Sequence, residues 1–202
     1  MAKPSPVSPL APAGFPRLPH VNGVSFATAE ARVKYRGRTD VMLARMVPGT
    51  AIAGVFTKSS TRSAAVLDCQ AKIGQHDQSG AAILVNSGNA NAFTGRNGLA
   101  SVHALTKALG QTLNLPETRI FTSSTGVIGE PLPHDRIEAK LSTLSDSLSG
   151  DAIEDAARAI MTTDTFPKGA GATIEIDGQP IHIAGIAKGS GMIAPDMATM
   201  LV

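Results

Sequence analysis

The chain has 202 residues, of which 43% are hydrophobic and 17% charged, a composition typical of a globular protein rather than a disordered or membrane-spanning one. The formal net charge is +2 and aromatic residues make up 3%, so the sequence has neither the basic surface nor the stacking rings typical of nucleic-acid binding. The single cysteine, Cys69, excludes an intramolecular disulfide framework and fits a reducing compartment.

Residues 1–13 are rich in proline and are expected to form an extended, disordered lead-in. They lack the apolar core of a signal peptide, and no run reaches the length of a membrane helix. We therefore expect a cytoplasmic protein without membrane or nucleic-acid partners. No domain-sized linker follows, so one α/β domain is predicted over 14–198.

Two strands are predicted over 41–47 and 51–57, with a Pro-Gly turn between them. The apolar run 81–86 is typical of a buried strand. It leads into 87–95, and the ten residues 86–95 hold three asparagines and two glycines, which suit a polar loop that lines a pocket. An ordinary strand-to-helix turn explains that loop equally well.

Helices are predicted over 99–113 and 134–148, each from apolar residues that recur on one face. A third is expected from Asp151, where Asp151 and Glu154 have the spacing of a capping box. Between the first two helices, 119–122 reads as a strand, and hydroxyls and glycines follow it. Such a strand end can hold an oxyanion with its N–H groups.

Helical periodicity stops after residue 160 in the string MTTDTFPK. Its hydroxyls and carboxylate could orient a small amino-acid substrate, although a solvated helix end is an equally good interpretation. A hairpin is predicted over 171–184, with Asp177-Gly178 as its turn. The five histidines have no metal-ligand spacing, and no phosphate-loop or dinucleotide motif occurs. Neither a metal nor a nucleotide site is expected.

The last fifteen residues, KGSGMIAPDMATMLV, combine a glycine run, Pro195 and the small pair Ala198-Thr199. This pattern would let the Thr199 hydroxyl attack the carbonyl of Ala198. A threonine freed at a new amino terminus can act as a nucleophile, with its own α-amine as the base. A loop that leads into a buried strand is the simpler interpretation of the same residues.

Five segments in order resemble the glutamate N-acetyltransferase/ornithine acetyltransferase family of arginine biosynthesis: GVFT, VNSGNANAFTG, SSTGVIGE, IMTTDTFPK and KGSGMIAPDMATML. The likeness extends over nearly the whole chain from about Gly14. It implies an α/β layered sandwich of the self-processing ornithine acetyltransferase/aminopeptidase type. It also implies that the precursor cleaves itself between Ala198 and Thr199, so that 199–202 begin a second, beta chain that completes the fold.

The same resemblance assigns the site residues. Thr199 would be the nucleophile, Thr125 and Gly126 would stabilise the oxyanion, and Thr162 and Lys188 would contact substrate together with Thr199. The implied reaction moves an acetyl group from N2-acetylornithine to glutamate, releasing ornithine, through an acetyl-threonine enzyme. No dissociable cofactor is implied, although acetyl-CoA could serve as a second acetyl donor.

The resemblance further implies a heterotetramer of two alpha and two beta chains. Two alternatives stay open: a self-processing amidase or aminopeptidase that hydrolyses its acyl-enzyme, and a silent half-molecule that binds amino acids or supports a partner chain. Threonine rather than serine at position 199 favours the transferase. Acetyl transfer after co-expression of the missing carboxy-terminal half would separate these possibilities.

Overall fold

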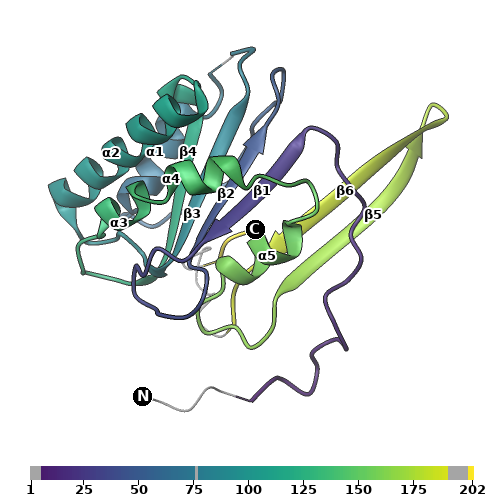
Figure 1. The fold of residues 1–202 in the computed structure, drawn as a ribbon, viewed down its shortest axis with the longest axis horizontal. Coiled ribbons are helices and arrows are strands. Elements are labelled where there is room, and N and C mark those ends of the chain that lie inside the picture. The colour runs from purple at the N-terminus through teal and green to yellow at the C-terminus, as the bar shows by residue number, and fades with distance from the viewer. Residues whose placement is uncertain (1–5, 76, 191–199) are drawn as a thin grey trace.

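The computed structural model describes residues 6–75, 77–190 and 200–202. Figure 1 shows a helix-covered sheet from which a two-stranded ribbon projects. The strands are β1 (Val24–Ala29), β2 (Val41–Met46), β3 (Ala81–Asn89), β4 (Ile120–Val127), β5 (Lys168–Ile176) and β6 (Gln179–Ala187). The helices are α1 (Ala64–Lys72), α2 (Gly95–Leu113), α3 (His134–Glu138), α4 (Leu141–Asp146) and α5 (Ile153–Ala159), with a 3₁₀ turn at Glu117–Arg119.

The main sheet has the order β1-β2-β3-β4, with antiparallel pairing between the first three strands and parallel pairing of β3 with β4. Parallel neighbours need a crossover connection, and α2 provides it. Because β3 and β4 run in the same direction, their carboxyl ends meet at one end of the sheet. This mixed α/β architecture agrees with the predicted fold class.

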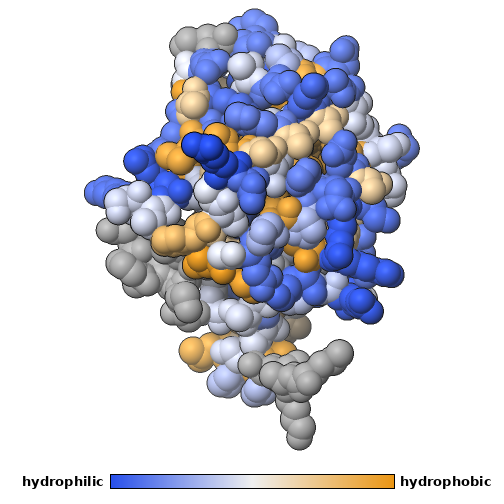
Figure 2. Space-filling model, turned by 90° about the vertical axis from the view of Figure 1, so that its left-hand side faces the viewer, coloured by the Kyte–Doolittle hydropathy of each residue, from blue (hydrophilic) through white to orange (hydrophobic). Residues whose placement is uncertain are grey.

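Side chains of β2 alternate between two cores, as a period of two requires. Val41 and Leu43 join the core beneath α2, α3 and α4, whereas Met42 and Ala44 join a second core with α5, Ile186 and Leu201. The molecular side that bears the helices at the left of Figure 1 is mainly hydrophilic, with small scattered apolar patches (Figure 2).

Several predicted elements are confirmed. The hairpin is present with Asp177 and Gly178 at its tip, both at positive φ (51° and 74°), as a two-residue type I′ turn requires. The helix predicted over 99–113 is α2, which begins four residues earlier at Gly95. The strands predicted over 41–47 and 81–86 correspond to β2 and β3.

Other predictions are wrong. Residues 51–57 form no strand, and a physical reason is that β1 and β3 already occupy both edges of β2. The single helix predicted over 134–148 divides into α3 and α4. At the junction the Lys140 N–H bonds to the Ile137 carbonyl, a tightened turn. Ile137, Leu141 and Leu144 are nevertheless buried as expected.

The capping box is also absent. Helix α5 begins at Ile153, and no side chain caps it. The Asp151 carboxylate lies instead 3.6 Å from His20 Nδ1, in an exposed contact.

Candidate active site

The carboxyl ends of β3 and β4 place two predicted motifs side by side. In the parallel register Asn86 lies opposite Ser124, Ser87 opposite Thr125, and Gly88 opposite Gly126, after which a bulge interrupts the ladder at Asn89. The hydroxyls and glycine of the SSTG motif therefore lie inside β4 rather than after it, which corrects the predicted strand end. The extra length follows from pairing with β3.

Gly126 is required by the close approach of the two strands. A Cβ atom at this position would lie 2.3 Å from the Gly88 carbonyl carbon, and its φ is +137°, a value that side chains rarely adopt. The backbone beside Thr125 is thus held in one position by packing. Fixed donors are what stabilisation of an oxyanion requires.

The segment after β6 contacts this strand end through Lys188. Its side chain is buried, and Nζ lies 3.2 Å from the Thr125 Oγ1 atom, which is buried as well. An ammonium can only donate, so the Thr125 oxygen accepts this bond. The hydroxyl proton of Thr125 is therefore available to donate to another group.

Asp164 joins the MTTD motif to the same segment. Its carboxylate accepts hydrogen bonds from Lys168 Nζ at 2.5 Å, from the Gly189 N–H at 2.8 Å and from the Thr162 N–H at 3.2 Å. The side chain has no solvent exposure. Burial alone would raise the pKa of Asp164, but the three donors outweigh burial and hold the pKa below its ordinary value.

The charge of Lys188 is balanced by the same group. Burial lowers the pKa of the Lys188 ammonium, Asp164 opposes that shift, and Lys168 adds to it. Asp164 thus pairs directly with Lys168 and acts on Lys188 through its charge. An ammonium next to the Thr125 hydroxyl would stabilise an oxyanion that develops there.

Strand β3 extends to Asn89, so residues 87–89 of the predicted loop belong to the strand. The asparagines at this strand end use their amides on the protein itself. Asn86 Nδ2 donates to the Asn89 carbonyl, and Asn86 Oδ1 accepts from Ser124 Oγ at 2.7 Å. Asn89 Nδ2 donates to the Glu130 carbonyl, while its Oδ1 accepts from the Asn91 N–H. These bonds favour the structural interpretation of the asparagine-rich segment, in which it fixes the end of β3 beside β4.

The structure therefore brings Thr125, Gly126 and Lys188 together, and connects Thr162 to them through Asp164. Ala198 and Thr199 lie outside the described residues. The sequence interpretation noted the carboxylate of the MTTD motif but missed its role in fixing Gly189 and Lys168. The spacing of four residues between Asp164 and Lys168 was the available signal, although they lie in a loop and a strand rather than a helix.

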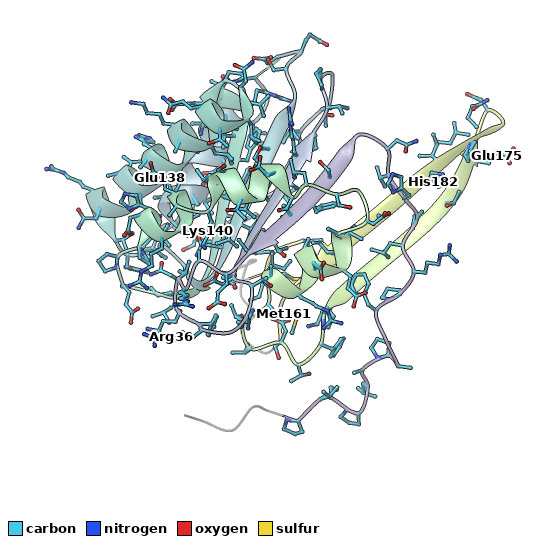
Figure 3. All side chains as sticks on the ribbon, viewed as in Figure 1. Arg36, Glu138, Lys140, Met161, Glu175 and His182 are labelled. Atoms are coloured by element: carbon cyan, nitrogen blue, oxygen red, sulfur yellow. The ribbon has the colours of Figure 1, made fainter. Side chains whose placement is uncertain are left out.

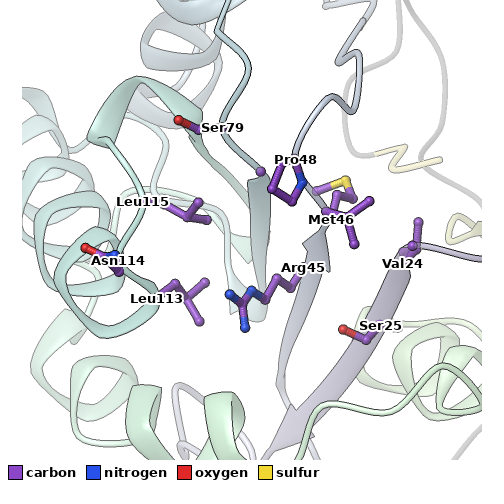
Figure 4. A pocket seen from close by; sticks show the side chains of 12 residues that line it. Val24, Ser25, Arg45, Met46, Pro48, Ser79, Leu113, Asn114 and Leu115 are labelled. Carbon is purple, nitrogen blue, oxygen red and sulfur yellow. The ribbon is translucent and has the colours of Figure 1, made fainter.

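Other candidate sites are weaker. An open pocket of about 750 Å³ is lined by Arg45, Leu113 and Asn114 among others (Figure 4). It lies at the start of β3, the opposite end of that strand from Asn89. In the described part of the chain, no three His, Cys, Asp or Glu side chains are grouped to hold a metal ion. Burial raises the pKa of the Cys69 thiol, which opposes a nucleophilic role.

Among the helices described here, none has the length and apolarity needed to cross a membrane. Helix α2, with 19 residues the longest of them, is amphipathic and packs its apolar face against the sheet.

Comparisons with known proteins agree with this geometry. The chain is 66% identical over its whole length to the arginine biosynthesis bifunctional protein ArgJ of Ruegeria pomeroyi, and 52% identical to that of Gluconobacter oxydans. It covers 50% and 47% of these two proteins, so it spans about half the length of the curated relatives it matches.

Solved structures give the same result. The crystal structure of the arginine biosynthesis bifunctional protein ArgJ of Bacillus halodurans superposes with a TM-score of 0.79 at 34% identity, covering 88% of this chain and 92% of that one. Ornithine acetyltransferase from Mycobacterium tuberculosis, complexed with ornithine, gives 0.77 at 33% identity, with coverage of 88% and 93%. The ArgJ family model matches residues 25–202, and the chain belongs to the ArgJ family.

Proposed function

We propose that this chain is the amino-terminal part of an acetyltransferase of arginine biosynthesis that moves the acetyl group of N2-acetylornithine to glutamate. The proposal is supported by the names of the relatives and by the structural neighbour described as an ornithine acetyltransferase bound to ornithine. Because the relatives are about twice as long, a carboxy-terminal half would supply the rest of the site. We also propose an assembly of two copies of each half.

The observation that carries the proposal is the buried contact between Lys188 and Thr125 beside Gly126. Lysine engages the threonine oxygen, so the threonine proton can point at an oxyanion. The Gly126 backbone is fixed by its contact with Gly88. Removal of one such donor in an acyl-transfer enzyme typically costs about 100- to 1000-fold in rate.

The proposed reaction has two acyl transfers. The Thr199 hydroxyl attacks the acetyl carbonyl of N2-acetylornithine, its proton passes through the α-amine to the departing ornithine nitrogen, and an acetyl ester of Thr199 results. The amine of glutamate then attacks this ester, and Thr199 regains its proton. Thr125 and Gly126 stabilise the oxyanion in both steps, and no dissociable cofactor takes part. Acetyl-CoA could load the same threonine.

Lys188 and Thr162 are proposed to contact the substrates. An ammonium is a compact charge suited to an amino-acid carboxylate, and the Thr162 backbone is positioned by Asp164. Thr199 becomes the nucleophile for acetyl transfer only after the bond to Ala198 is cut, because its α-amine is released in that step.

The test uses the full-length precursor, purified as the natural sequence and as Thr199→Ala. We expect intact-mass analysis to show two chains for the former, with the cut after Ala198, and one uncut chain for the latter. Acetylglutamate should form from N2-acetylornithine only with the natural protein. Normal processing of Thr199→Ala would remove the self-cleavage mechanism, and release of free acetate without transfer would support the amidase alternative.

A further inference from the structure

The β5–β6 ribbon has one apolar face that nothing in the described part of the chain covers. Alternate residues of a strand share a face, and Ile174 lies opposite Ile181 in the ribbon's register. Ile176 and Ile183 belong to the same face. These four isoleucines are 42–52% exposed. An extended apolar strip of this kind marks a binding surface.

The other face of the ribbon is already occupied. A Cβ atom on Gly169 would lie 2.5 Å from the Phe15 ring, and one on Gly171 would lie 2.5 Å from Pro19, so residues 15–19 cross this face in contact. Further toward the tip this face is polar and carries Glu175 and His182, both on the projecting part of the ribbon (Figure 3). Ile186, nearer the base, packs against the core beside α5.

The free edge of β6 can be identified from the turn. In a two-residue hairpin turn the residues that flank the tip, Ile176 and Gln179, form a hydrogen-bonded pair. Odd-numbered residues of β6 therefore direct their N–H and C=O groups toward β5, and even-numbered residues direct them outward. Pro180 is at an even position, as expected because proline has no N–H to give to the β5 ladder.

One bridge, between Lys188 and Leu201, already lies on this outer edge. The Lys188 N–H donates to the Leu201 carbonyl at 2.9 Å, and the Leu201 N–H donates back at 3.4 Å, an antiparallel bridge. Lys188 is even-numbered and follows β6 directly, so Leu201 lies on the free edge. In this register, chain beyond Val202 is directed along β6 toward the ribbon tip, past Ile186, Ala184 and His182.

We propose that the polypeptide that follows Val202 in the full-length protein adds a third strand to the outer edge of β6, and that the carboxy-terminal half covers the isoleucine face. The proposal rests on the proposed two-part enzyme. The occupant is argued from the direction of the bridge, from the exposed apolar face and from relatives twice as long as this chain. A strand added in this way satisfies the outward N–H groups and removes an open sheet edge.

The test measures amide hydrogen exchange at residue resolution in the full-length protein. The N–H groups of His182 and Ala184 point outward, so we expect them to exchange at least about 100-fold more slowly than Gly178 at the tip. Exchange of Ala184 as fast as Gly178 would overturn the proposal. Protection that disappears on dilution would identify a second copy as the occupant, and would also overturn it.

A pair of variants tests the apolar face. Ile183→Glu should lower the thermal midpoint of the full-length protein by at least about 4 °C. His182→Glu, one residue earlier and therefore on the opposite face of the ribbon, should change the midpoint by no more than about 1 °C. Equal midpoints would show that the isoleucine face remains in water. Neither readout uses acetyl transfer, so failure of the proposed reaction would leave both results interpretable.

Discussion

Replacing Asp164 by asparagine removes the carboxylate that links three segments, while keeping the shape of the side chain. The amide has one acceptor oxygen for the two sets of donors. Whichever way it turns, its NH₂ group faces either the Thr162 N–H or the Lys168 and Gly189 donors. An unsatisfied buried group costs about 1 to 3 kcal/mol, and the lost charge adds to this. We expect a decrease in unfolding free energy of about 2 to 4 kcal/mol at pH 7.

The pH dependence gives a second measure. The folded-state pKa of Asp164 is lowered, so its stabilisation is fully present above the ordinary aspartate pKa of about 3.9 and is lost as pH falls through the folded value. Urea unfolding from pH 3 to 8 should therefore show a constant difference between the variant and the natural protein above pH 5, and a smaller one at pH 3. Asp155→Asn, an exposed control in α5, should change little. A difference below about 1 kcal/mol at pH 7 would contradict the argument.

Three further variants probe the site. Thr125→Val should reduce acetyl transfer by about 100- to 1000-fold in steady-state assays, with a loss of only about 1 kcal/mol in urea unfolding; a rate within twofold would return Thr125 to a structural role. Lys188→Met should raise the KM for N2-acetylornithine and for glutamate to a similar extent, and an effect on one substrate alone would require separate pockets. Gly126→Ala should lower the free energy of unfolding by about 2 to 4 kcal/mol. Gly129 is the control, because it also has a positive φ but open space around its Cβ position, and Gly129→Ala should cost about 1 kcal/mol. Equal losses of unfolding free energy would show that the contact with Gly88 does not matter.

Local patterns in the sequence predict most elements of this fold. The hairpin was predictable because Asp177-Gly178 sets the turn chemistry within two residues, and α2 because its apolar period extends over several turns. The absence of a strand at 51–57 could not be predicted, because β propensity does not say whether a sheet edge is free. The same limit applies to β4, whose length depends on β3.

The candidate site depends on contacts between distant residues. The resemblance named Thr125, Gly126 and Lys188, but the sequence could not show that the lysine is buried against a hydroxyl 63 positions away. Nor could it show that Asp164 accepts from Gly189, 25 positions along the chain. Such contacts depend on how β4 and β6 are placed by the sheet and its second core. Thr199 remains a prediction from its motif.

The separation of Thr125 from Lys188 has a consequence for the order of events during synthesis. Translation adds about 5 to 20 residues each second, and amino-terminal regions fold first. The four strands of the main sheet and the helices α1 to α5 all precede Lys188 in the chain, so they can pair before that lysine leaves the ribosome. The carboxyl ends of β3 and β4 would then already be folded, and the segment after β6 would dock onto them last. Any chemistry that needs Lys188 beside Thr125 is thereby delayed until the sheet has formed.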